Sequence, residues 1–324
     1  MRSILIISIT ISSMPIFYIQ HTTRYSYPQP ARYSANQVIL FPIKDEYQEV
    51  IRHELQVTRD PIISVHRDYF GNEVGTFTLI EPHHELLIDS KLTVKTKPRI
   101  KPEITQSTAE QWQELNSKAA ILPYGDFLKI EHFEAHSEIQ RMIDARNPGQ
   151  YNPYQLAKYF CKEVFEQFQY IKGVTTVETT LDEIWKLKAG VCQDFAHMLL
   201  ALLRMVNIPA RYVSGYICPN QSGMRGEGAT HAWVEAYLPF YGWLGFDPTN
   251  NCIANEKHVR LAVGRHFSDC SPVKGTYRGS AEHTLEVSVT VQYEEEYKPE
   301  EQEPMVQQHV MNTTTGNHPQ QVQQ

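Results

Sequence analysis

The stretch GVCQDFAHMLLALLRMVNIPARYVSGY, residues 190–216, joins a long apolar helix to a polar first turn. From residue 195 to residue 206 only one histidine and one arginine interrupt the apolar side chains, which is typical of a helix buried in a core. Pro209 cannot continue a helix, so we expect the helix to end there and a buried strand to follow. Cys192 and Asp194, in the first turn, need a different explanation.

A cysteine in the first turn of a helix is well placed to act as a nucleophile. Unpaired backbone N–H groups and the positive end of the helix dipole favour the thiolate, which is the reactive form of cysteine. We interpret Gly190 as the residue that lets the chain turn tightly into the helix and leaves room beside the sulfur of Cys192. We expect Asp194 and His197 to act as a cap and a buried polar contact, not as catalysts.

A nucleophilic cysteine needs a base, and the base needs an orienting partner. His231 lies in the alternating segment THAWVEAYL, and Asp247 lies in WLGFDPTNN. The turn between these two predicted strands is centred near Phe240. Adjacent antiparallel strands would therefore bring His231 and Asp247 roughly level, within reach of a hydrogen bond. Cys192, His231 and Asp247 together form the pattern of a thiol triad, which is recognised by the roles of its members.

Acyl transfer also requires donors that stabilise an oxyanion. The backbone N–H of Cys192 is one expected donor, because it lies at the start of the helix. A second donor is needed, and its candidates lie in residues 170–180, just upstream. The sequence leaves the choice among them open.

Each of these residues also has a simpler interpretation. Cys192 alone could be a buried core thiol, His231 a packed histidine, and Asp247 a turn residue before a proline. Their combination favours catalysis over these alternatives. Trp233 and Trp243 flank the predicted site, and we interpret both as packing residues and not as a surface for substrate stacking.

Helical spacing dominates the chain from residue 107 to the cysteine helix. One apolar face of the helix expected after Pro153 contains Leu156, Tyr159, Phe160 and Val164. The next segment offers a capping box at Thr180 and Glu183, with Gly190 as the expected end of that helix. After the cysteine helix the pattern changes to alternating strands, so this region is α+β.

Residues 16–97 are predicted to form an antiparallel β domain, because they are rich in β-branched and aromatic residues with polar turns between them. The expected strand segments are 17–27, 36–43, 53–60, 61–80 and 84–97. Two prolines mark residues 98–106 as a linker.

The catalytic domain is predicted at residues 107–292, with its core motifs at 180–252. A β segment at 284–293 closes this domain. The tail at 293–324 is acidic and then rich in Gln and Asn, and a segment of this composition is expected to be disordered.

The composition limits the partners and the compartment. The net charge of −7 provides no basic surface for nucleic acid, and no membrane partner is indicated. Five cysteines without a CxxC pair favour a reduced, cytoplasmic protein. Residues 1–15 leave open an alternative, export through a short signal-like segment. Cys218, Cys252 and Cys270 lack the spacing of zinc ligands, so we expect no metal and no cofactor. The oligomeric state is left open.

Three stretches together resemble the transglutaminase-like superfamily of bacterial type, whose members are often described as transglutaminase-like cysteine peptidases. They are residues 190–216, HAWVEAYLPFYGWLGFDPTNN at 231–251, and LAVGRHFSDCSPVKGTYRG at 261–279. Residues 17–43 also resemble the N-terminal region found in those proteins, so the resemblance covers about residues 16–292.

The resemblance implies a papain-like α+β core preceded by an antiparallel β domain. In that core, a helix bundle carries the cysteine and packs on an antiparallel sheet. The family's Cys, His and Asp fall on Cys192, His231 and Asp247, and acyl chemistry would proceed through a thioester at Cys192. One departure is His266, where the family pattern has an acidic residue.

Three functions remain compatible with this pattern. The first is hydrolysis of peptide or protein amides, and the second is transglutaminase activity, in which an amine replaces water. The third is a non-catalytic binding module of the same fold, against which the complete triad argues.

Overall fold

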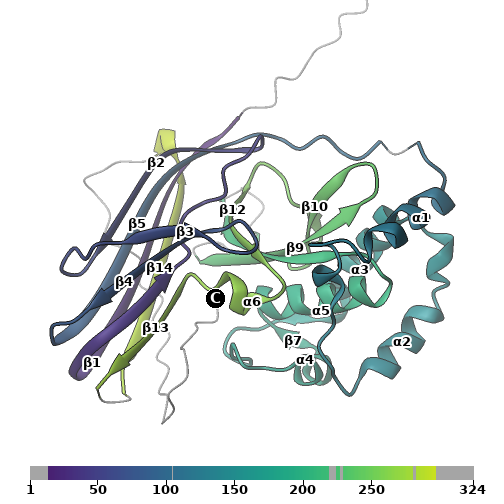
Figure 1. Cartoon of the computed structure of the whole chain (residues 1–324). Coiled ribbons are helices and arrows are strands. Elements are labelled where there is room, and N and C mark those ends of the chain that lie inside the picture. The colour runs from purple at the N-terminus through teal and green to yellow at the C-terminus, as the bar shows by residue number, and fades with distance from the viewer. Residues whose placement is uncertain (1–13, 104, 219–223, 227–228, 280–281, 297–324) are drawn as a thin grey trace, which may run out of the picture.

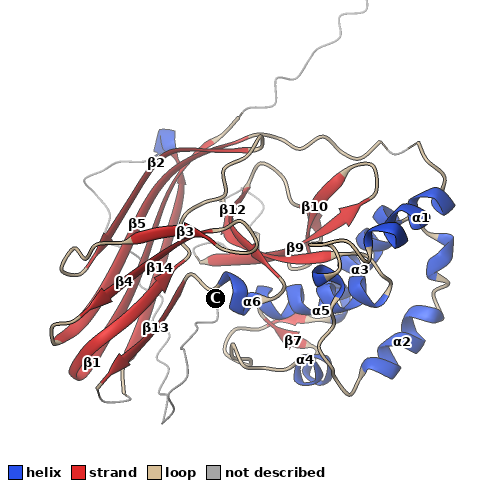
Figure 2. Ribbon diagram, viewed as in Figure 1, coloured by secondary structure: helices blue, strands red, loops and turns tan. Residues whose placement is uncertain are grey.

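A computed structural model describes residues 14–103, 105–218, 224–226, 229–279 and 282–296. The chain forms three layers (Figures 1 and 2): a large N-terminal sheet, a smaller central sheet and a group of helices. The α+β class and the antiparallel β domain in front of a papain-like core are confirmed. The segments predicted at 1–15 and 293–324 fall almost entirely outside the described residues.

The N-terminal sheet has seven strands, all antiparallel to their neighbours. Five of them come from the N-terminal third of the chain: β1 (Ile16–Val38), β2 (Gln48–Val57), β3 (Ser64–Arg67), β4 (Glu73–Leu79) and β5 (His83–Thr96). β13 (Val273–Arg278) and β14 (Thr284–Tyr293) complete the sheet by pairing with β1.

Strand β1 is one continuous strand, whereas the sequence predicted two separate strands at 17–27 and 36–43. Its first half lies between β5 and β14, and its second half lies between β4 and β13. The pairing register shifts between Ser26 and Ala31 and again between Arg32 and Ala35. Such bulges let a strand bend and change partners without ending, which is why the polar residues here do not form a turn.

The last two strands return to the N-terminal sheet. Residues up to 292 were predicted to belong to the catalytic domain, but β14 pairs with β1 along ten residues, from Ser26–Thr284 to Phe17–Tyr293. We therefore assign β13 and β14 to the N-terminal sheet. A strand joins the sheet that provides its hydrogen-bond partner, whatever its position in the chain.

The central sheet has five antiparallel strands in the order β11-β10-β9-β8-β12. They are β8 (Ala210–Ile217), β9 (Thr230–Leu238), β10 (Gly242–Asp247), β11 (Cys252–Ile253) and β12 (His258–Gly264). One side of this sheet packs against the helices, through residues such as Tyr212 and Ala262. Tyr216 and Leu261 pack instead with residues of the N-terminal sheet. The central sheet thus belongs to two cores at once.

The helices are α1 (Thr108–Lys118), α2 (His136–Asp144), α3 (Pro153–Gln167), α4 (Leu181–Leu187), α5 (Cys192–Met205) and α6 (Phe267–Cys270). The capping box of Thr180 and Glu183 begins α4 as predicted. The helix ends earlier than the predicted Gly190, at Leu187, and its C-cap Lys188 adopts a left-handed conformation (φ 49°). Within the described ranges, no helix is both long enough and apolar enough to cross a membrane.

Two amide side chains join the N-terminal sheet to β12, the edge strand of the central sheet. Gln48 Nε2 donates to Arg260 O (2.7 Å), and Gln48 Oε1 accepts from Arg260 N (2.7 Å). Asn72 bonds to Val263 N and Val263 O in the same way, at 2.8 Å each. These side chains replace the backbone of a neighbouring strand, so the edge of the central sheet is covered.

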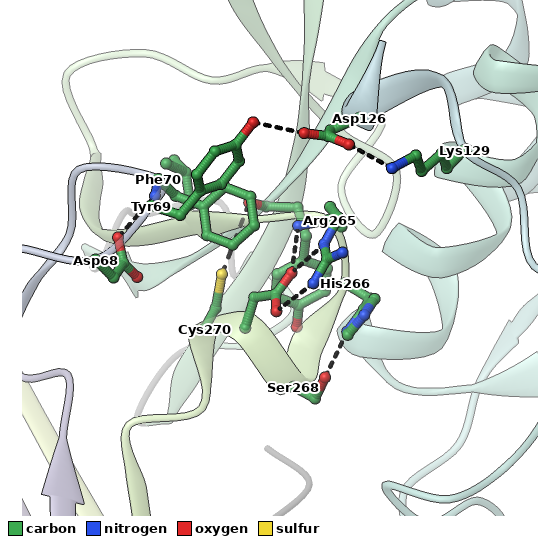
Figure 3. A network of polar contacts seen from close by, with 12 residues as sticks. Asp68, Tyr69, Phe70, Asp126, Lys129, Arg265, His266, Ser268 and Cys270 are labelled. Carbon is green, nitrogen blue, oxygen red and sulfur yellow. Dashed lines mark hydrogen bonds and ion pairs between the residues drawn. The ribbon is translucent and has the colours of Figure 1, made fainter. Parts of the chain in front are cut away.

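A polar network ties three further segments together beside this junction (Figure 3). Tyr69, from the turn between β3 and β4, donates to Asp126 (2.5 Å), which also accepts from Lys129 (2.5 Å). Arg265, just after β12, forms an ion pair with Asp269 (3.0 Å). His266, the departure noted above, begins α6 and lies 2.5 Å from the hydroxyl of Ser268.

Candidate active site

Helix α5 begins with a cap built by Asp194. The Asp194 carboxylate accepts hydrogen bonds from Val191 N (2.7 Å) and from the Thr175 hydroxyl (2.7 Å). Asp194 is 1% exposed, and burial raises its pKa. The predicted cap is confirmed, and it also anchors the loop that contains Thr175. His197 makes the predicted polar contact, since its Nε2 accepts from Phe267 N (3.1 Å), but its side chain is only partly buried.

Gly190 has a different role from the one predicted. Its backbone is not in the left-handed region, so the turn does not require glycine. A β carbon at this position would lie 2.3 Å from Asp194 Oδ2. The space beside Gly190 is therefore filled by the Asp194 carboxylate and is not reserved for the sulfur of Cys192.

His231 and Asp247 form a buried pair at the end of the central sheet. His231 Nε2 lies 2.8 Å from Asp247 Oδ2, and both side chains are fully buried. The ladder between β9 and β10 ends at Val234 and Phe246, so the pair closes just beyond the last paired residues. The two strands thus bring together residues that are sixteen positions apart.

The protonation of His231 depends on two neighbours. Burial acts to lower its pKa, but the Asp247 carboxylate outweighs burial and Cys192 adds to the same effect, so the pKa of His231 is raised to about 10. Because Nε2 of His231 is hydrogen-bonded to Asp247, Nδ1 is the nitrogen that can exchange a proton with the Cys192 thiol. Among the described residues, Nδ1 makes no hydrogen bond of normal geometry, and Gly226 covers it closely, since a β carbon there would lie 2.6 Å away.

Asp247 receives hydrogen bonds from every side. Its Oδ1 accepts from the backbone N–H groups of Thr249 (2.9 Å) and Asn250 (3.3 Å). Its Oδ2 accepts from the Asn250 side chain (2.8 Å) and lies 3.3 Å from His258 Nε2, in addition to the bond with His231. Burial alone would raise the pKa of Asp247, but the two histidines hold it well below its usual range.

Tyr170 lies beside the cysteine. β6 (Gln169–Tyr170) pairs in parallel with β7 (Ala189–Gly190), which places Tyr170 opposite Gly190, two residues before Cys192. The Tyr170 ring also meets Phe195 edge to face, with the centroids 6.2 Å apart. Burial raises the pKa of Tyr170, and the charge of Cys192 raises it further. Tyr170 is the first residue of the segment expected to hold the second oxyanion donor.

Trp233 fills space behind the site. It is fully buried, as the packing interpretation predicted. Both neighbouring strands have a glycine beside the indole: a β carbon on Gly215 would lie 2.6 Å from the Trp233 ring, and one on Gly245 would lie 3.2 Å from it. The Arg211 guanidinium carbon lies over the Trp243 ring, 4.4 Å from the centroid of that ring. This contact also fits a packing role for Trp243.

His258, at the start of β12, contacts Asp247 but was not predicted from the sequence. The only signal was a polar residue at the head of the apolar segment HVRLAVG.

The five cysteines are free thiols, and burial raises the pKa of Cys161, Cys218 and Cys270. These three are therefore core residues.

A cysteine at the start of a central helix, with histidine and aspartate on the adjoining sheet, is the arrangement of the papain-like class of fold. The chain belongs to the transglutaminase-like superfamily. Residues 142–248 match the core of that superfamily, and residues 17–95 match the bacterial transglutaminase-like N-terminal region.

Several known proteins are similar to this chain. The uncharacterized protein ML0607 of Mycobacterium leprae is 33% identical over 275 residues, which cover 84% of this chain and 96% of that protein. A Protein-glutamine gamma-glutamyltransferase of Pseudomonas aeruginosa is 27% identical over 165 residues, which cover 48% of this chain and 22% of that protein.

A solved structure has the same fold over most of both chains. It is that of a Cytophaga hutchinsonii protein described as a candidate cysteine protease, with a TM-score of 0.68 and 23% identity. The alignment covers 86% of this chain and 91% of that chain.

Proposed function

We propose that this protein is a thiol-dependent enzyme that cleaves peptide or protein amides through a thioester at Cys192. The observation that carries the proposal is the position of His231. Its Nε2 is hydrogen-bonded to Asp247, and both Asp247 and Cys192 raise its pKa. A base held between a carboxylate and a thiol is the arrangement that nucleophilic catalysis by cysteine requires. Superfamily membership supports the same class of chemistry.

The proposed reaction has two steps. The Cys192 thiol transfers its proton to His231 Nδ1, and the sulfur attacks the amide carbonyl carbon. The tetrahedral intermediate collapses as the C–N bond breaks, and His231 returns the proton to the leaving amine. Water then loses a proton to His231 and attacks the thioester, which releases the acid and regenerates the thiol. Asp247 keeps His231 in the required tautomer and stabilises its cation.

Two donors are proposed for the oxyanion. One is the backbone N–H of Cys192, which is at the first position of α5, where N–H groups have no partner within the helix. The other is the Tyr170 hydroxyl. Tyr170 is held opposite Gly190 by the β6–β7 pair, and the charge of Cys192 acts on its phenol. Together they would meet the charge that develops in the transition state.

Hydrolysis is the favoured second step, because it needs only water and His231. Transamidation needs in addition a place for an acceptor amine. It is the second candidate because the Pseudomonas aeruginosa relative is named as a protein-glutamine gamma-glutamyltransferase. In both reactions Cys192 forms the same acyl-enzyme, so the two differ only in what attacks the thioester.

One experiment separates these reactions. The protein is incubated with a glutamine-containing protein, such as casein, and a fluorescent primary amine. Release of ammonia or of peptide fragments without incorporation of the amine supports hydrolysis, and incorporation supports transfer. Both should be lost in Cys192→Ala. If Cys192 reacts with iodoacetamide no faster than a free thiol does, the proposed function is wrong.

A further inference from the structure

A second histidine contacts the carboxylate of the proposed triad. His258 lies at the start of β12, and its side chain is 1% exposed. Its Nε2 lies 3.3 Å from Asp247 Oδ2, the same oxygen that His231 Nε2 approaches at 2.8 Å. Trp233 meets the His258 ring edge to face, with the centroids 5.2 Å apart. The imidazole is therefore held on two sides.

The surrounding hydrogen bonds determine the tautomer of His258. A carboxylate accepts and does not donate, so the hydrogen of the neutral ring is on Nε2. Nδ1 then accepts from Asn255 N (3.2 Å). The Asn255 side-chain oxygen lies farther from Nδ1, at 3.4 Å, and accepts instead from Lys257 N (3.0 Å). One backbone N–H thus fixes which nitrogen of His258 faces Asp247.

The charges around His258 favour its neutral form. Burial lowers its pKa and the cationic His231 lowers it further, while Asp247 and Glu256 oppose this effect without overcoming it. His258 therefore provides a hydrogen bond without a second positive charge. Asp247 is left to balance a single imidazolium, that of His231.

The same place could be interpreted as a metal site. Ligand atoms of Asp247, Cys252 and His258 all lie within 4.8 Å of one another. A metal bound there would need the lone pair of His258 Nε2, but that nitrogen carries the hydrogen, because Nδ1 accepts from Asn255 N. The Cys252 thiol would also have to ionise, although burial and Asp247 raise its pKa to about 12. The hydrogen bonds therefore favour a donor role for His258.

We propose that His258 is a positioning residue, whose Nε2–H holds the Asp247 carboxylate in the orientation that His231 requires. This inference rests on the proposed function of Cys192, His231 and Asp247. It adds a fourth member to the set: a chain of hydrogen bonds from Asn255 N through His258 and Asp247 to His231. Partners of this kind set the orientation of the groups that act directly.

The test uses two substitutions in the full chain. His258→Gln keeps a donor near the position of Nε2, and His258→Phe fills the space without one. The first measurement is the rate at which iodoacetamide alkylates Cys192 as a function of pH, followed by mass spectrometry of the Cys192 peptide. The second is nitrogen-15 NMR of the histidines, which reports the tautomer of His258 and the pKa of His231. Far-UV circular dichroism and thermal unfolding monitor the fold.

We expect neutral His258 with its hydrogen on Nε2 at pH 7 in the wild-type protein. His258→Phe should slow alkylation at pH 7 by about tenfold or more and lower the pKa of His231, whereas His258→Gln should stay within about threefold of wild type. The inference is wrong if both variants match wild type, or if both lose reactivity equally. It is also wrong if NMR finds the hydrogen on Nδ1, a result that does not depend on whether His258→Phe folds.

Two further outcomes separate the competing explanations. Stoichiometric binding of Zn²⁺ that is lost in Cys252→Ser would show that the cluster is a metal site and would overturn the inference. A wild-type Cys192 that reacts like a free thiol would remove the proposed function. The tautomer of His258 found by NMR would still test the hydrogen bond between His258 and Asp247 independently of the proposed function.

Discussion

The Asp194 carboxylate occupies the space that a side chain on Gly190 would fill: a β carbon at residue 190 would lie 2.3 Å from Asp194 Oδ2. This contact connects the cap of α5 to the strand that leads into it. The same carboxylate holds Val191 N and the Thr175 hydroxyl. The position of Cys192 therefore depends on a glycine whose backbone conformation is ordinary.

Gly190→Ala should destabilise the protein by about 1–3 kcal/mol, because the new methyl group must displace a buried, bonded carboxylate. Urea unfolding measures the change. Gly149→Ala is the matched control, since Gly149 is exposed, has no left-handed conformation and has no atom near its missing β carbon. That control should be neutral or slightly stabilising. Equal effects of the two substitutions would contradict the contact described here.

Asp247→Asn should lower the pKa of His231 from about 10, since burial remains while the carboxylate charge that outweighs it is removed and only Cys192 still raises the pKa. In the wild-type protein the pair stabilises the fold fully below the unfolded pKa of 6.5, and this stabilisation is lost as the pH rises towards 10. The stability advantage over Asp247→Asn should therefore be largest near pH 6 and shrink by pH 10.

Urea unfolding at three pH values checks this prediction, together with NMR titration of His231. The exposed residue Glu178 provides the control, Glu178→Gln, whose stability difference from wild type should vary little with pH. A difference between wild type and Asp247→Asn that is the same from pH 6 to pH 10 would show that Asp247 does not set the protonation of His231.

Tyr170→Phe should separate acyl transfer from simple alkylation. Hydrolysis of p-nitrophenyl acetate passes through an oxyanion, and loss of one donor should slow it by about 100-fold. Alkylation by iodoacetamide forms no oxyanion, so its rate at Cys192 should stay near that of wild type. Tyr33→Phe, at a residue that is 58% exposed, is the control. If hydrolysis and alkylation slow equally, Tyr170 affects the folding of the site or the ionisation of Cys192 and does not bind the oxyanion.

Gln48→Ala should weaken the junction between the N-terminal sheet and β12. The substitution removes the side-chain partner of the buried Arg260 N–H, while Arg260 O keeps the hydrogen bond from Ile43 N (3.2 Å), so the expected cost is about 1–3 kcal/mol. Gln48→Glu keeps the acceptor and loses the donor, so its free energy of unfolding should lie between those of Gln48→Ala and wild type. Gln113→Ala, on the exposed side of α1, serves as the surface control. Unfolding that is unchanged in Gln48→Ala would show that the two layers do not depend on this contact.

Local patterns predicted much of this protein from its sequence. The apolar run of α5 identifies the central helix, because a helix without a polar face must be buried. The capping residues of α4 act within one turn, so their role is visible in the sequence. The alternation around His231 and Asp247 predicted two adjacent strands, and the structure brings these residues to 2.8 Å.

Other features depend on contacts between distant segments. β14 ends in the N-terminal sheet because its partner is β1, more than 250 residues earlier in the chain. Gln48 reaches Arg260 across 212 positions, and no local pattern marks it as a substitute for a strand. Such pairings are chosen by shape and hydrogen bonding in the folded chain, and the sequence around each residue carries no trace of them.

The sequence by itself determined the central helix and its cap, because each follows from periodicity or residue type over a short span, and it predicted that His231 and Asp247 would meet on adjacent strands. Only the tertiary structure decided that Gly190 makes room for Asp194, that Tyr170 lies beside the cysteine, and that His258 shares the carboxylate of Asp247. The physical reason is the same in each case. A buried polar atom must find a partner, and which partner it finds depends on what the whole fold places next to it.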